Sequence, residues 1–154
     1  MPSDRVAASP AISPLVPGDL PTVKAIERAG QVFPWSDALL TGELSCDHAC
    51  HFGARIGRDP PLRAFILCRL FCNDLAIHNL CTDPKMRRFG LATALIRHTI
   101  AHARSHGAQA AFLEVRSSNG AAIALYSREG FSVLDLRRKY YTNGDDALVM
   151  NRLL

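Results

Sequence analysis

The six residues from Arg87 to Ala92 read RRFGLA, and they separate a predicted strand from a predicted long helix. Unpaired amides at the start of a helix, a glycine that permits close approach of the backbone and two neighbouring cations together favour binding of a diphosphate. The turn has neither the lysine and hydroxyl of a Walker loop nor the three glycines of a dinucleotide fingerprint. Taken alone, it fits a basic turn that only caps a helix equally well.

The residues on either side of this turn predict a mixed α/β domain, of the α+β kind. Apolar residues at helical spacing predict helices, and alternating or continuous apolar runs predict strands. The pair Asn143-Gly144 predicts a tight hairpin turn, and a second turn is expected at residues 57–61. The expected elements are helices Leu20–Gly30 and Ser36–Leu44, strands His51–Ile56, Leu62–Phe71 and Leu75–Thr82, helix Leu91–His106, strand Ala110–Arg116, helix Ala121–Arg128, and strands Phe131–Tyr141 and Ala147–Leu153.

The composition is that of one globular domain. The chain has 154 residues, of which 48% are hydrophobic and 21% charged. We assign the domain to residues 18–154 and expect residues 1–17, which are rich in proline, to form a flexible arm. The arm lacks the apolar core of a secretion signal, and the alternative to a flexible arm is a transit peptide. No apolar run reaches the roughly 18 residues of a membrane span. Five cysteines, mostly in apolar segments, favour reduced thiols and a cytoplasmic location.

The pattern R-x-x-G-x-A after a strand, followed by helix, strand and helix ending in Gly-Phe, resembles the acetyl-CoA-binding motif of the GNAT N-acetyltransferases. Further segments resemble the RimI branch of that family, which acetylates the N-terminal alanine of a small-subunit ribosomal protein. The resemblance implies the GNAT fold, a mixed and mostly antiparallel sheet, flanked by helices, whose central parallel strands splay apart. The matching segments are IERA (Ile26–Ala29), FPWS (Phe33–Ser36), LEVR (Leu113–Arg116), SN (Ser118–Asn119), AAIALY (Ala121–Tyr126), RRKYY (Arg137–Tyr141) and DA (Asp146–Ala147).

The resemblance also implies a cosubstrate, acetyl-CoA, and the residues that hold it; it implies no metal. The backbone of one strand end would hold the acetyl and pantetheine portion, and the RRFGLA turn would wrap the pyrophosphate. Asn119 matches an asparagine that contacts the cofactor, and the alternative is that it only caps the following helix. The cofactor-binding residues expected from the resemblance are Leu80, Cys81, Thr82, Arg87, Arg88, Phe89, Gly90, Leu91, Ala92, Thr93 and Asn119.

Glu114 lies in an apolar run that predicts a buried strand, where a bare carboxylate is costly. It must therefore be functional or be neutralised by Arg116 or Arg137. For Tyr126, on the following helix, the alternative to a functional role is a tyrosine that packs in the core. The resemblance assigns both to catalysis: Glu114 takes the proton of the acceptor amine and Tyr126 protonates the leaving thiolate. A base helps because a peptide amine, with a pKa of about 7.7 to 8.0, is mostly protonated at neutral pH.

The chain departs from the family pattern at two positions, residues 76 and 120. Ala76 stands where many GNAT proteins carry a glutamate, so His78 becomes a second candidate base, with a hydrogen-bonded strand histidine as the alternative. Gly120 replaces an alanine-like residue and is expected to loosen the start of its helix.

The segment CDHACH (Cys46–His51) lacks a second ligand pair at zinc-finger spacing, so we expect no metal. Cys81 is expected to be a small apolar residue rather than a nucleophile.

The acceptor side is predicted from four aromatic residues that match positions near the acceptor in the family. Phe33, Trp35, Tyr140 and Tyr141 are expected to wall a peptide groove, and the alternative is that they fill the edge of the core. The leading hypothesis is a protein N-alpha-acetyltransferase that acts on the N-terminus of a ribosomal protein in a ternary complex. Alternatives are a GNAT for a small amine or lysine side chain and a non-catalytic acetyl-CoA-binding module. No module that reads nucleic acid is apparent, and no membrane partner is expected.

Overall fold

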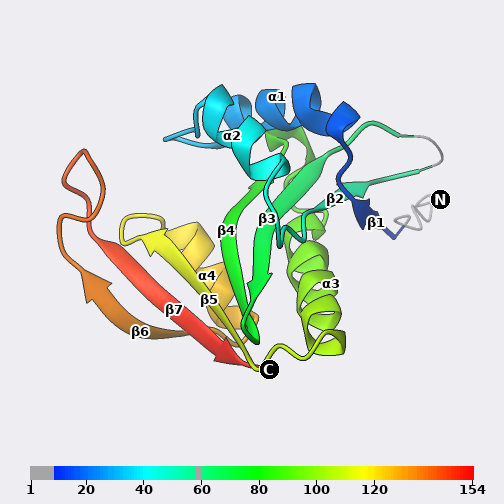
Figure 1. Cartoon of the computed structure of the whole chain (residues 1–154). Helices are drawn as coiled ribbons and strands as arrows, with labels where there is room; N and C mark the ends of the chain where they lie inside the picture. The colour runs from blue at the N-terminus through cyan, green and yellow to red at the C-terminus, as the bar shows by residue number, and fades with distance from the viewer. Residues whose placement is uncertain (1–8, 58–59) are drawn as a thin grey trace, which may run out of the picture.

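A computed structural model of the chain describes residues 9–57 and 60–154. Among these residues seven strands form one sheet in the order β1-β2-β3-β4-β5-β7-β6 (Figure 1). The pairing of β4 with β5 is parallel and the other pairings are antiparallel, so the predicted mixed sheet is confirmed. The strands are β1 (Ala11–Pro14), β2 (Phe52–Arg55), β3 (Ala64–Phe71), β4 (Asp74–Thr82), β5 (Ala110–Arg116), β6 (Ser132–Arg137) and β7 (Ala147–Leu153).

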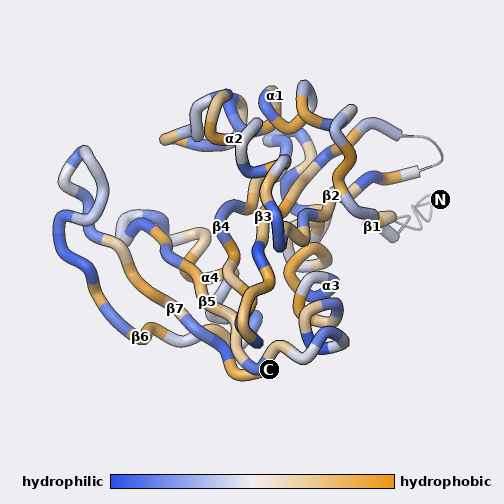
Figure 2. The backbone as a smooth tube through the Cα atoms, viewed as in Figure 1, coloured by the Kyte–Doolittle hydropathy of each residue, from blue (hydrophilic) through white to orange (hydrophobic). Residues whose placement is uncertain are grey.

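Four α-helices flank the sheet: α1 (Leu20–Gly30), α2 (Asp37–Leu44), α3 (Leu91–Ser105) and α4 (Gly120–Arg128). Two short 3-10 turns, Pro17–Asp19 and Pro84–Met86, complete the fold. Helices α3 and α4 pack on one face with a large buried cluster that includes Leu95, Ile77 and Leu113. Helices α1 and α2 lie on the other face, where Val23 and Leu40 pack against Phe65 of β3. Hydropathy alternates along α3, as expected for a helix with one buried face (Figure 2).

The first two helices begin and end where the sequence predicts. Ser36 caps α2, since its hydroxyl oxygen accepts a hydrogen bond of 3.1 Å from the amide of Leu39. Gly30 ends α1 beside β4, where an added Cβ would lie 2.6 Å from the Cys81 sulfur. Glycine is therefore required at this position, because only a bare backbone lets the end of α1 approach β4.

The parallel strands β4 and β5 separate halfway along their length. They pair from Asp74 with Ala110 to Ile77 with Leu113, and each strand then continues without the other. This is the predicted splay. Just beyond the last pair, β4 carries a bulge: on its β3 side Cys68 pairs with Ile77 and Leu67 with Asn79, which leaves His78 as an extra residue. The bulge turns both His78 and Asn79 toward the face that carries α1 and α2.

Two predictions of the sequence are corrected. Part of the expected flexible arm is structured, because residues 11–14 pair with β2 as an edge strand and a 3-10 turn follows; residues 1–8 lie outside the described residues. The predicted hairpin is also wrong in detail. Strand β6 ends at Arg137, and residues 138–146 form a long, mostly hydrophilic loop in which Gly144 adopts a positive φ of 88° (Figure 2). The predicted turn at 57–61 includes residues 58–59, which also lie outside the described residues.

Candidate active site

The RRFGLA turn joins β4 to α3 with the backbone shape that an anion site requires. Arg88 and Gly90 have positive φ angles of 68° and 74°, and Gly90 is the N-cap of α3 without a side-chain hydrogen bond. A Cβ added to Gly90 would meet no atom within 4 Å, so the glycine leaves open space in front of the helix terminus. The first amides of α3 point into this space with the positive end of the helix dipole. The turn therefore fits the phosphates of a coenzyme.

The end of β4 lies next to this turn, on the open side of the splay. Leu80, Cys81 and Thr82 continue the strand after its pairing with β5 has ended, as expected for residues whose backbone holds a thioester. The side chain of Cys81 is buried, and burial raises the pKa of its thiol to about 12. This thiol is therefore a packing group, as predicted, and not a nucleophile. Asn119 caps α4, since its side-chain oxygen accepts a bond of 3.2 Å from the amide of Ala122.

On the other side of the splay a pocket of about 550 Å³ opens toward α2 and the loop after β6. We call it the acceptor pocket. Trp35, Tyr140 and Tyr141, three of the four aromatic residues expected to form the walls of the site, line it. Phe33 does not line it and is half exposed. The lining residues are Trp35, Ala76, Ile77, His78, Phe112, Leu113, Glu114, Arg137, Tyr140, Tyr141 and Val149.

Glu114 opens into the acceptor pocket and is not buried. The expectation of a buried acid is therefore wrong: β5 alternates, and Glu114 projects from its exposed face while Leu113 and Val115 enter the core. Arg137 donates a hydrogen bond of 2.7 Å to the carboxylate, which is one of the two neutralising pairs the sequence offered. Hydrogen bonding to Glu114 and its negative charge raise the pKa of Tyr140. Glu114 thus belongs to a polar group on the pocket wall.

Tyr126 is the buried residue of α4 and lies on the opposite side of the sheet, in the core cluster that α4 shares with α3. It is 7% exposed and packs edge-on against Phe131 with ring centroids 5.7 Å apart. Burial raises the pKa of its hydroxyl well above the usual range, and the nearby thiol of Cys68 adds to this effect. The hydroxyl therefore stays protonated throughout the neutral range, which is the state a proton donor needs.

Arg116 connects the two loops at the mouth of the acceptor pocket. Its guanidinium lies 3.9 Å from the ring centroids of both Phe33 and Tyr141. It also donates hydrogen bonds of 3.0 and 3.1 Å to Asn143 and Asp145 of the loop after β6. The sequence suggested Arg116 only as a partner of Glu114, a pairing that the structure does not form. Its actual role is to hold the loop before α2 against the loop after β6.

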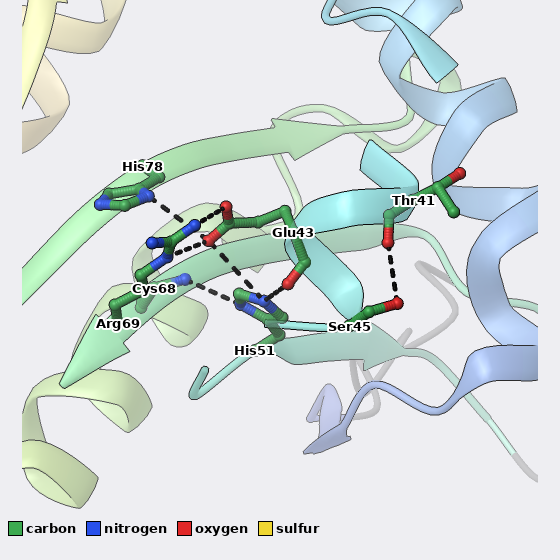
Figure 3. Close-up of polar contacts among 7 residues, drawn as sticks. All are labelled: Thr41, Glu43, Ser45, His51, Cys68, Arg69 and His78. Atoms are coloured by element: carbon green, nitrogen blue, oxygen red, sulfur yellow. Dashed lines mark hydrogen bonds and ion pairs between the residues drawn. The ribbon is translucent and has the colours of Figure 1, made fainter. Parts of the chain in front are cut away.

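A buried polar network beside the pocket was not predicted (Figure 3). Glu43 of α2 is 5% exposed and accepts two hydrogen bonds from the Arg69 guanidinium, at 2.9 and 2.6 Å. His78 Nδ1 lies 3.4 Å from the same carboxylate. His51 Nδ1 accepts from the Cys68 amide at 3.0 Å, so its other nitrogen carries the proton and donates to the Glu43 carbonyl oxygen at 2.9 Å. Burial lowers the pKa of His51, which fits this neutral form.

A second buried acid, Glu27 of α1, fixes the loop that carries Trp35. Glu27 is fully buried and accepts hydrogen bonds of 3.0 Å from the amide of Trp35 and from the side chain of Asn79. Gln31 donates to Asn79 and to the Leu80 carbonyl oxygen, at 3.0 and 3.2 Å. The end of β4 and the loop before α2 are thereby tied to the same helix. The IERA segment marked the place, but the buried role of its acid was not predicted.

Within residues 9–57 and 60–154, no group of three or more histidine, cysteine, aspartate or glutamate side chains is arranged to hold a metal ion. No helix in the same residues is long and apolar enough to cross a membrane.

A splayed parallel pair between a glycine turn and an acceptor pocket defines a coenzyme-A-dependent acyltransferase of the GNAT type. The chain belongs to the acetyltransferase (GNAT) family, which matches residues 20–131. It is therefore an acetyl-CoA-dependent N-acetyltransferase, as predicted.

Its relatives lie in the predicted branch of that family. The ribosomal protein bS18-alanine N-acetyltransferase of Escherichia coli K12 is 34% identical over 90% of this chain and 94% of the relative. The N-alpha-acetyltransferase RimI of Mycobacterium tuberculosis is 32% identical over 84% of each chain. The crystal structure of the ribosomal-protein-S18-alanine N-acetyltransferase from Escherichia coli superimposes with a TM-score of 0.85 at 33% identity, over 94% of this chain and 93% of that one. The predicted resemblance to the RimI branch is confirmed.

Proposed function

We propose that the protein transfers an acetyl group from acetyl-CoA to the N-terminal alanine of a ribosomal protein of the bS18 type. The relatives of this chain carry that activity in their names. The observation that carries the proposal here is the shape and chemistry of the acceptor pocket. Trp35, Tyr140 and Tyr141 line it, together with Glu114 beside the splay, and Arg116 joins the two loops that carry these aromatic residues. A chain terminus can enter such a site.

When bound, acetyl-CoA supplies the activated acyl carbon. We place its pyrophosphate against residues 87–93, where the glycine turn and the α3 terminus offer amides and cations. Its pantetheine would lie along the backbone of Leu80, Cys81 and Thr82, and Asn119 would contact it while still capping α4. No strand pairs with these residues on the side that faces the splay, because β5 has diverged, although the Leu80 carbonyl oxygen accepts a hydrogen bond from Gln31.

Glu114 is proposed to take a proton from the attacking nitrogen. It faces the acceptor pocket from the first position of β5 beyond the splay, so the amine would reach it before the thioester. Arg137 pairs with the carboxylate at 2.7 Å, and partial exposure allows a bridging water. Tyr126 is proposed to protonate the departing sulfur from the opposite side of the sheet. Its buried, protonated hydroxyl suits that role.

The test is a radiolabelled acetyl-transfer assay over short peptides that differ only at the first residue, with an alanine-starting ribosomal peptide among them. We expect transfer to that peptide and none to a matched peptide whose N-terminus is already blocked. Transfer to polyamines or lysine side chains, without transfer to any free N-terminus, would refute the proposed function. Glu114→Gln should lower turnover and leave acetyl-CoA affinity nearly unchanged.

A further inference from the structure

His78 occupies a position in the acceptor pocket that none of the proposed roles uses. It is the bulged residue of β4, immediately after the last pair with β5. Glu114 is the equivalent residue of β5, immediately after the same pair. In parallel strands, neighbouring residues point to the same face, so His78 and Glu114 face the acceptor pocket from the two sides of the splay. An amine that approaches a thioester held in the splay must pass between them.

Glu43 orients the imidazole of His78. Its carboxylate lies 3.4 Å from Nδ1, whereas Figure 3 shows the other ring nitrogen directed away from the network. Although burial acts in the opposite direction, the hydrogen bonds from Arg69 hold the pKa of Glu43 below its usual range. An ionised carboxylate favours the tautomer with a proton on Nδ1, which leaves a lone pair on Nε2. The side chain of His78 is 33% exposed, so that lone pair is accessible.

The proton balance of the reaction requires two acceptors. A peptide terminus arrives mostly as an ammonium ion, and it becomes an amide that retains one of its three protons. Of the two protons lost, one is balanced by the proton that the leaving sulfur gains, and the other is released to solvent. A single carboxylate that is already paired with Arg137 must unload its first proton before it can accept the second.

We propose, on the basis of the proposed function, that His78 is the first proton acceptor of the reaction. Its Nε2 takes a proton from the bound ammonium and passes it to solvent. The neutral amine then attacks, and Glu114 takes the second proton as the carbon–nitrogen bond forms. Tyr126 protonates the sulfur as the carbon–sulfur bond breaks, and exchange with solvent moves the proton from Glu114 and restores that of Tyr126. Glu43 is a positioning residue that acts through His78.

The groups that surround His78 include more acidic than basic side chains. The network contributes the anion of Glu43, the cation of Arg69 and neutral His51. The acceptor pocket contributes the ion pair of Glu114 with Arg137, together with the hydroxyls of Tyr140 and Tyr141. A second hollow that His78 also lines contributes Asp47, His48 and Asp74, and the thiols of Cys46 and Cys72. The one ion-pair contact of His78 among the described residues is with the Glu43 carboxylate, 3.4 Å from Nδ1.

The test is the pH profile of kcat/KM with an alanine-starting peptide. Without His78, the enzyme can use only the amine that is already neutral in solution. For a terminus with a pKa of about 7.8, that fraction is about one-twentieth at pH 6.5 and nearly complete at pH 9. His78→Asn should therefore lie within about twofold of the wild type at pH 9 and about tenfold or more below it at pH 6.5. A purely structural role would lower the two values equally.

Three comparisons sharpen the result. Glu114→Gln should lower kcat/KM at every pH, because the second proton must be removed whatever the state of the incoming amine. Glu43→Gln should reproduce the loss at low pH to a smaller degree. Added imidazole should restore the activity of His78→Ala at pH 6.5 and change nothing at pH 9. Thermal unfolding of each variant would separate a loss of fold from a loss of proton transfer.

The possible failures are distinguishable. If the wild type acetylates the peptide and His78→Asn loses the same factor at pH 6.5 and pH 9, or if imidazole restores nothing, the role of His78 is refuted and the proposed function stands. If the wild type acetylates no free N-terminus, the proposed function falls and this role falls with it.

Discussion

Replacing Tyr126 by phenylalanine removes the proposed proton donor and little else. The ring remains in the core cluster and keeps its edge contact with Phe131, so packing is conserved. The change of a buried hydroxyl to hydrogen should alter the free energy of unfolding by about 1 kcal/mol or less. By contrast, a positioned acid or base contributes a factor of about 10² to 10⁴ to the rate. At about 1.36 kcal/mol for each factor of ten, the barrier should rise by about 2.7 to 5.4 kcal/mol.

The assay is thiol release at saturating acetyl-CoA and peptide, repeated with acetyl donors whose leaving thiols are progressively more acidic. A more acidic thiol needs less help from a proton, so the deficit of Tyr126→Phe should shrink along the series. Tyr140→Phe is the matched control, because Tyr140 lies on the acceptor side and should show no dependence on the leaving group. Full turnover of Tyr126→Phe, or a deficit that is the same for every thiol, would contradict the assignment.

Three other substitutions test the account. Arg116→Lys keeps the charge but loses the planar contact with Phe33 and Tyr141, which is worth about 1 to 2 kcal/mol. The KM for the peptide should therefore rise roughly 5- to 30-fold, whereas the affinity for acetyl-CoA should not change. An unchanged KM would contradict the role of Arg116. Gly90→Ala places a side chain on a residue with a positive φ, at a cost of about 1 to 2 kcal/mol. Calorimetry should therefore show weaker binding of acetyl-CoA. An unaltered affinity would argue against this turn as the phosphate site. Burial raises the pKa of Glu27 despite hydrogen bonds from Trp35, Asn79 and Gln31, so the folded state binds the proton more tightly than the unfolded chain. The stability of the wild type relative to Glu27→Gln should then fall as pH rises from about 4 to 7, and denaturant unfolding that shows a rise would contradict this sign.

Much of the fold follows from local rules in the sequence. Ser36 and Gly30 mark helix ends because a serine side chain caps the first amides of α2 and only glycine fits beside Cys81. The bounds of β5 and β7 agree with their apolar runs. The edge strand β1 was missed because it is short, ends in proline and is ordered only through its pairing with β2. The loop after β6 was missed because Asn143-Gly144 is a local signal, whereas residues 138–146 are held by Arg116 and by distant backbone contacts.

In the candidate site, too, features with a local sequence signal were predictable and features that depend on tertiary contacts were not. The shape of the RRFGLA turn was predictable, since two cations followed by a glycine at a helix start form a continuous pattern. The burial of Glu114 was wrongly predicted, because an apolar run does not show which face of a strand is covered. The network of Glu43, Arg69 and His78 could not be predicted, since its members come from α2, β3 and a bulge that shifts the register of β4. The sequence offered His78 as a second candidate base, but a bulge leaves no local signal in this sequence, so the contact of His78 with Glu43 emerged only from the structure.

The central claim is that the acceptor is the amine of a chain terminus. The most direct test is tandem mass spectrometry of a peptide that begins with alanine, contains an internal lysine and has been incubated with the protein and acetyl-CoA. The account predicts one acetyl group, on the alanine nitrogen. Acetylation of the lysine with a free alanine terminus would contradict it.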